Sequence, residues 1–216
     1  MNQIFIIDDH PIVRSGISNL LLSLPGHAIC GEAATIPEAR ALLESITPDL
    51  ILLDILLKEG SGLDFLKELR ANKHPAKVVI LSMMDEVVYA ERALRAGADG
   101  FVMKEQAVTE VELAIKTALA GQTYLSAEVA QQIALRATHN SASQTRDRDL
   151  ATLTDRELQV FELIGRGLTS KQIASDLSLA TTTIQSHKQH IRNKLNCHTM
   201  AELNRSAAKF VEGSGR

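Results

Sequence analysis

Polar residues that could do chemistry follow directly on apolar segments of the sequence. They are Asp8 and Asp9 after IFII, Asp54 after LILL, Ser82 after VVIL and Lys104 after GFVM. Three carboxylates gathered at one point repel one another unless one is protonated or they share a cation, and ligation by oxygen atoms alone suits Mg2+. A carboxylate beside Mg2+ can attack phosphorus while an ammonium and a hydroxyl bind the transferred oxygens, giving an aspartyl phosphate. The simpler alternative is that each aspartate only caps a following helix.

This chemistry requires a fold that gathers these residues at one edge. Short apolar runs alternate with helical periodicity over the first 120 residues, a pattern typical of βαβ units. The predicted strands are 3–7, 28–33, 50–53, 77–81 and 100–103, and the predicted helices lie near 12–24, 36–46, 62–71, 86–96 and 108–120. We expect an α/β, doubly wound, five-stranded parallel sheet, in which the order 2-1-3-4-5 brings the polar strand ends to one crevice. Thr35 with Glu38 predicts a capping box, and Asp85 is a candidate cap for the fourth helix.

The remainder of the chain is predicted to be helical. After a helix at 126–137, the polar stretch HNSASQTRDRD at 139–149 has no apolar residue larger than alanine and is predicted to be a flexible linker. Helices are expected at 155–166, 170–177, 181–196 and 199–210. We therefore predict three parts: a first domain at 1–121, a helix plus linker at 122–149, and an all-α, four-helix domain at 150–216 with a helix-turn-helix plan.

Charge separates the two ends of the chain. Residues 1–149 contain 14 Lys and Arg against 20 Asp and Glu, whereas residues 150–216 contain 9 against 6. A basic tail favours a polyanionic partner, and the absence of Trp argues against a stacking surface for single strands. The 181–196 helix has an outer face of Gln, Ser, Lys and Arg, and these residue types can read base edges and hold phosphates. Double-stranded DNA is the expected partner.

The first 120 residues resemble the receiver domain of a two-component response regulator. The resemblance lies in DDH near the start, Asp54 ending LILLD, Ser82 in ILSM and Lys104 in GADGFVMK. It implies that Asp54 is the phosphoacceptor, that Ser82 and Lys104 hold the phosphate, and that Mg2+ is bound by a set of three carboxylates and one carbonyl. That set is Asp8, Asp9, Asp54 and the backbone carbonyl of Leu56. Phe101 matches the switch aromatic of the family or is an ordinary core residue.

The loop after Asp54 departs from the pattern common in receivers. Leu56 stands where many relatives have Asn, and Lys58 stands where many have Pro. We expect a looser loop and an altered phosphoryl lifetime. Lys58 either pairs with Asp54 or the phosphate, or is simply an exposed lysine.

The C-terminal segment resembles the LuxR-type helix-turn-helix, so the whole chain resembles a NarL/FixJ-type regulator. The match rests on LTDRELQVFELIGRGLTSKQIA. By resemblance, the base-reading residues are Gln185, Ser186 and Gln189, and the phosphate contacts are Lys171, Thr182, His187, Lys188 and Arg192. The 199–210 helix is the implied dimer helix. Ala180 replaces the usual Ser cap, and Thr181 is a candidate substitute.

The resemblance predicts a transcription factor that a sensor histidine kinase phosphorylates and that then forms a homodimer on promoter DNA. One alternative is a constitutive DNA-binding regulator whose receiver serves only for protein contacts. Another is a phosphatase or phosphotransferase, although no acid/base carboxylate stands two residues after Asp54. A zinc site is a minor alternative for the group formed by His187, His190, Cys197 and His198.

The sequence also predicts the compartment. The N-terminus lacks the basic and apolar blocks of a secretory signal, and apolar runs such as Ile4–Ile7 are only four residues long. We expect no membrane contact, a cytoplasmic location, and reduced thiols at Cys30 and Cys197.

Overall fold

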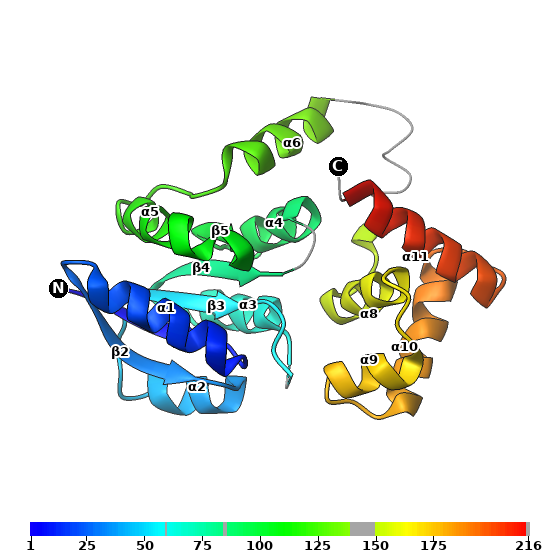
Figure 1. The fold of residues 1–216 in the computed structure, drawn as a ribbon, viewed down its shortest axis with the longest axis horizontal. Coiled ribbons are helices and arrows are strands. Elements are labelled where there is room, and N and C mark those ends of the chain that lie inside the picture. Colours follow the sequence, from blue (N-terminus) through cyan, green and yellow to red (C-terminus); the bar gives the residue numbers. More distant parts are fainter. Residues whose placement is uncertain (59, 84–85, 139–149, 215–216) are drawn as a thin grey trace. The chain divides into compact units, whose positions relative to one another are not determined.

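The computed structural model describes residues 1–58, 60–83, 86–138 and 150–214. It divides the chain into two compact units, Met1–Ala134 and Leu135–Arg216 (Figure 1). Helix α6 (Ala127–Thr138) begins in the first unit and ends in the second. The linker expected at 139–149 and the cap expected at Asp85 lie outside the described residues.

The first unit is the predicted α/β fold. Its strands are β1 (Asn2–Ile7), β2 (His27–Ala33), β3 (Leu50–Asp54), β4 (Lys77–Ser82) and β5 (Gly100–Met103). All neighbouring pairs are parallel, and their order is β2-β1-β3-β4-β5. The helices are α1 (Pro11–Ser23), α2 (Ile36–Leu43), α3 (Gly62–Ala71), α4 (Glu86–Arg95) and α5 (Ala107–Leu119), with a short 3-10 turn, η1 (Lys104–Gln106), before α5. The predicted fold class is confirmed.

Helices bury both faces of this sheet, which explains why its central strands are almost wholly apolar. Ile4 and Leu52 belong to a buried cluster with Ile17 of α1 and Ile115 of α5. The alternate residues of the same strands point to the opposite face and are buried as well, as in the case of Phe5. The strands therefore have no solvated face, and their polar residues are confined to the strand ends.

The cap predicted for α2 forms with one difference. Thr35 Oγ1 accepts a hydrogen bond from the Glu38 amide at 3.3 Å, as expected. Glu38 Oε2, however, accepts from the amide of Ala34 at 2.7 Å rather than from that of Thr35. The carboxylate thus reaches one residue further back than a capping box requires.

After α6 and the residues left undescribed, the second unit includes α8 (Asp155–Gly165), α9 (Ser170–Asp176), α10 (Thr181–Lys194) and α11 (Met200–Ser214). Capping boxes start α8 at Thr154 and α9 at Thr169. Helix α11 packs closely on α8, where a Cβ added to Gly165 would lie 2.3 Å from the carbonyl oxygen of Ala207. The rings of Phe161 and Phe210 lie 5.6 Å apart in the same contact.

The start of α10 corrects one expectation. Ala180 is the N-cap and makes no side-chain capping bond, while Thr181 is already the first helical residue. Thr181 therefore does not replace the missing cap, because an N-cap must precede the first helical residue. Within the described ranges, no helix is long and apolar enough to cross a membrane.

Candidate functional site at the strand ends

The strand ends bring the predicted chemical residues together. Asp8 and Asp9 follow β1, Asp54 ends β3, Ser82 ends β4, and Lys104 follows β5. The side chains of Asp8, Asp54 and Lys104 are 0%, 1% and 4% exposed. Since β1, β3, β4 and β5 are parallel and adjacent, their carboxyl ends meet at one edge. This is the juxtaposition expected from the sequence.

Backbone amides fix the orientation of two of the aspartates. Asp8 Oδ1 accepts from the amide of His10 at 2.8 Å, and Asp54 Oδ1 accepts from the amide of Leu56 at 2.9 Å. Each bond closes a turn over two residues, a common arrangement for Asp at the end of a strand. The caps of the following helices are His10 for α1, without a side-chain bond, and Ser61 for α3. Helix capping therefore does not explain Asp8 or Asp54.

Lys104 lies between two carboxylates. Its Nζ is 2.7 Å from Asp54 Oδ2 and 2.7 Å from Asp8 Oδ2. Burial lowers the pKa of Lys104, but attraction to both carboxylates outweighs it and the net shift is upward. Burial raises the pKa of Asp54, against the opposing effects of His10 and Lys104. The site thus holds the charged ammonium of Lys104 beside the carboxylate of Asp54, and burial makes the negative charge of that carboxylate energetically costly.

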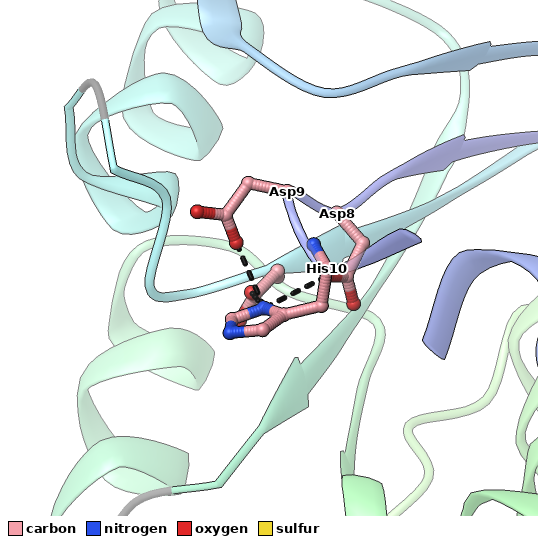
Figure 2. Close-up of side chains that lie close together, drawn as sticks. Asp8, Asp9 and His10 are labelled. Carbon is pink, nitrogen blue, oxygen red and sulfur yellow. Dashed lines mark hydrogen bonds and ion pairs between the residues drawn. The ribbon is translucent and has the colours of Figure 1, made fainter. Parts of the chain in front are cut away.

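His10 also belongs to the cluster, although the sequence prediction did not assign it a role. Its Nδ1 lies 2.8 Å from Asp9 Oδ1 and 3.2 Å from Asp8 Oδ1 (Figure 2). The same nitrogen is 3.8 Å from Asp54 Oδ2. The interaction with Asp54 raises the pKa of His10 most, and that with Asp9 adds to it, while partial burial works against both. The DDH motif contained the signal, because His10 directly follows the aspartate pair.

Gly62, which the sequence prediction also did not assign to the site, packs against the backbone of Asp54. A Cβ added to Gly62 would lie 2.1 Å from the carbonyl oxygen of Asp54, far closer than any real contact. The Gly62 amide donates to the carbonyl of Ile55 at 3.0 Å. The loop after β3 folds back so tightly that only glycine fits at this position. Its place, eight residues after Asp54, was the sole sequence signal.

In the second unit, α10 presents a polar face. Four predicted contacts recur at intervals of three and four residues and are exposed: Thr182, Gln185, Ser186 and Gln189. Lys171 of α9 is exposed too. Lys188 and Arg192 are half-buried, and Lys188 Nζ bonds Ser170 Oγ at 2.7 Å, which ties α10 to the start of α9.

His187 lies at the border of this face. Its ring is half-buried, and burial, followed by the charge of Arg156 in α8, lowers its pKa. Among the described residues its Nδ1 has no hydrogen-bond partner. His187 thus faces the packed side of α10 more than the four exposed residues do.

Comparison with known proteins gives the family. Residues 4–116 match the model of the response regulator receiver domain, and residues 151–207 match that of bacterial regulatory proteins of the luxR family. A Pseudomonas aeruginosa PAO1 protein named "Putative transcriptional regulator" is 36% identical over 94% of this chain and 95% of its own length. The nitrate/nitrite response regulator protein NarL of Escherichia coli K12 is 33% identical, covering 92% of this chain and 91% of NarL. The chain belongs to the two-component response regulators.

Solved structures agree with this assignment. A two-component response regulator of the LuxR family from Aurantimonas sp. SI85-9A1 is 34% identical with a TM-score of 0.61, covering 64% of this chain and 99% of the other. An RcsB–DNA complex shares the fold at 21% identity and a TM-score of 0.57, over 96% of this chain and 98% of that chain. The response regulator thus has a receiver followed by a LuxR-type DNA-binding domain.

The acidic pocket of this receiver fits the Mg2+ that receivers bind. Carboxylate oxygens of Asp8, Asp9 and Asp54 and a nitrogen of His10 all lie within 4.8 Å of one another. Asp8 Oδ2 is buried against Lys104 Nζ at 2.7 Å, and Asp9, whose side chain is 6% exposed, has its Oδ1 2.8 Å from His10 Nδ1. Buried oxygens of this kind are stabilised by a cation.

The departures in the receiver loop have definite positions. Leu56 is half-buried and forms an isolated bridge with Ser61. The amide of Lys58 donates to Asp9 Oδ2 at 3.1 Å, and its exposed Nζ lies 3.9 Å from the same atom. Lys58 therefore lies beside Asp9. Phe101 is 1% exposed within β5, and Ser82 is fully buried.

Proposed function

We propose that phosphorylation of Asp54 by a partner histidine kinase switches dimerisation and promoter binding of this response regulator in the cytoplasm. The observation that carries the proposal is the shared ammonium: Lys104 Nζ lies 2.7 Å from both Asp54 Oδ2 and Asp8 Oδ2. A receiver needs a positive group at this point, because the transferred phosphoryl group brings about two negative charges to a buried carboxylate.

The residues divide the work of phosphoryl transfer. An oxygen of Asp54 attacks phosphorus as the bond from phosphorus to the kinase histidine breaks. Lys104 and the Ser82 hydroxyl then bind phosphoryl oxygens. Mg2+, when held by Asp8, Asp9, Asp54 and the Leu56 carbonyl, supplies further positive charge. The Leu56 amide bonds Asp54 Oδ1, so Asp54 Oδ2 is the attacking oxygen once Lys104, 2.7 Å away, shifts to the phosphoryl group.

The switch follows from movement of Lys104. The ammonium exchanges a contact with Asp54 for one with the phosphoryl group, and Ser82 moves toward the same group. Phe101 pairs in register with Ile80, and Ser82 pairs with Met103, so Phe101 lies two positions from Ser82 along these neighbouring strands. Its ring fills the space that Ser82 leaves. The added phosphoryl charge thus changes the conformation of the surface formed by α4 and β5, and this alters the contacts that the receiver makes.

In the DNA-binding domain, α10 enters the major groove of duplex DNA. The exposed Gln185, Ser186 and Gln189 read base edges. The phosphates are held by Lys171, Thr182, His187, Lys188 and Arg192, and α11 contributes the dimer contact. The domains that carry these roles are 1–121 and 150–216, joined by 122–149. Such dimers favour half-sites about one helical turn apart.

Selection of sites from random duplex DNA tests this function. The full chain is used with and without beryllofluoride and Mg2+, with Asp54→Asn as the control that cannot take the phosphoryl mimic. Enrichment of a two-half-site motif only with the mimic, and only in the unsubstituted protein, supports the phosphorylation switch. Equal enrichment in all samples would refute it and support the constitutive regulator whose receiver makes protein contacts alone.

A further inference from the structure

His10 extends the carboxylate cluster with a different kind of donor atom. Its Nδ1 lies 2.8, 3.2 and 3.8 Å from oxygens of Asp9, Asp8 and Asp54. Ligands about 2.1 Å from an octahedral cation are separated by roughly 3.0 Å when adjacent and roughly 4.2 Å when opposite. The separations of 2.8 and 3.2 Å are near the adjacent value and that of 3.8 Å lies between the two values, so small side-chain shifts let one cation contact the imidazole and the carboxylates together.

The backbone around His10 keeps the ring at the cluster. The His10 amide donates to Asp8 Oδ1, and Pro11 fixes the chain at the first residue of α1. The side chain is 48% exposed, so the rest of the ring is accessible to water. An imidazole held at its backbone and open to solvent can bind a cation without moving the strand.

An independent observation points to a ligand between these groups. The Asp9 side chain is 6% exposed, and within the described residues its Oδ1 has no hydrogen-bond partner although His10 Nδ1 is 2.8 Å away. The 2.8 Å separation suits an ion pair when Nδ1 is protonated, and a cation bound by both atoms takes the place of that proton when the ring is neutral.

We propose that His10 Nδ1 is a metal ligand, so that this site takes a later first-row transition dication such as Co2+ more tightly than an all-oxygen receiver site would. Carboxylate oxygens suit Mg2+, Ca2+ and Mn2+, whereas imidazole favours the later transition ions. The nitrogen therefore adds binding energy for Co2+ that Mg2+ gains only weakly. The inference rests on the metal site of the proposed function and concerns which ion that site prefers.

Metal titration of the full chain tests the preference. Calorimetry measures the dissociation constants of Co2+ and Mg2+ for the unsubstituted protein, for His10→Ala and for His10→Gln. His198→Ala is the matched control, because His198 is an exposed histidine in the other unit. Loss of a partner of a metal site commonly costs 10- to 100-fold in affinity. We expect Co2+ affinity to fall by about tenfold or more in both His10 variants and Mg2+ affinity to change less than about threefold.

Electron spin echo spectroscopy of bound Mn2+ gives a direct readout of the ligand. Modulation from a directly bound 14N nucleus is expected in the unsubstituted protein and in His198→Ala, and is expected to vanish in His10→Ala. Two results would overturn this inference and leave the metal site itself intact. One is Mg2+ binding with no 14N modulation of bound Mn2+, and the other is an equal loss of Co2+ and Mg2+ affinity in His10→Ala. A rise in affinity for both ions would overturn it in favour of an imidazolium that competes with metals. Failure of Mg2+ to bind at all would refute the metal site of the proposed function as well.

Discussion

Gly62→Ala should destabilise the receiver because it forces the loop after β3 away from Asp54. The new Cβ would lie 2.1 Å from the Asp54 carbonyl oxygen and 3.0 Å from the Ile55 Cα. Both neighbours are backbone atoms at the end of a buried strand, so neither can rotate away. The methyl group must therefore displace the chain itself, by about 1 Å if it is to reach an ordinary contact distance.

The magnitude follows from three terms. Overpacking of a tightly packed site costs about 1–3 kcal/mol. Weakening of the Gly62 amide bond to the Ile55 carbonyl adds about 1 kcal/mol. Alanine lowers the conformational entropy of the unfolded chain, which offsets the destabilisation by about 0.4–1 kcal/mol. The free energy of unfolding should thus fall by about 1–3 kcal/mol.

Urea unfolding of the receiver, followed by circular dichroism, measures this loss. With a slope of about 2 kcal/mol/M, the midpoint should fall by about 0.5–1.5 M. Gly16→Ala is the matched control, since Gly16 lies inside α1, is exposed, and has nothing within 4 Å of an added Cβ. It should raise stability by about 0.5–1 kcal/mol because alanine favours helices. Equal midpoints for the two variants would refute the reasoning, as would a stabilised Gly62→Ala.

Three further outcomes are expected. Gly165→Ala should lower the melting temperature of the C-terminal unit, with a cost of about 1–3 kcal/mol, because its Cβ would press on the Ala207 carbonyl; an unchanged melting curve would argue against close α8–α11 packing. Arg70→Ala removes bonds to three carbonyls and a carboxylate and should cost roughly 2 kcal/mol in urea unfolding, whereas Arg40→Ala breaks an exposed ion pair and should change little. Burial raises the folded-state pKa of Asp54, so its protonation stabilises the fold at low pH and this contribution is lost as pH rises through that pKa. In EDTA, Asp54→Asn should therefore gain stability relative to the unsubstituted protein as pH rises above about 4, and a constant difference would contradict this.

The sheet could be predicted closely because burial on both faces leaves a strong sequence pattern. Strands were predicted at 3–7 and 50–53, and they are found at Asn2–Ile7 and Leu50–Asp54. The polar strand ends could be assigned for the same reason, since Asp54 and Lys104 interrupt apolar runs. Periodicity and strand order together carry this part of the site.

The contributions of His10 and Gly62 depended on geometry that no periodicity encodes. Whether the ring of His10 turns toward the carboxylates depends on the turn at Asp8. Whether Gly62 touches Asp54 depends on how the loop from Ile55 folds back. The carboxylate of Glu38 likewise accepts from the amide of Ala34 rather than from the expected amide of Thr35, since its flexible side chain can reach either one. Such contacts depend on distances of an ångström or less.

The position of the first strand has a consequence for synthesis on the ribosome. Although β1 is made first, it pairs on both sides, with β2 and with β3. Residues 2–7 must wait for residues 50–54 to leave the exit tunnel before both edges of β1 are covered. The edge strand β5 is completed later still, when the Phe101 amide donates to the carbonyl of Tyr124 and the Tyr124 amide donates to that of Asp99. The outer edge of β5 therefore stays unpaired until about 124 residues have emerged, and an unpaired apolar strand of this kind is prone to pair with other chains during that interval.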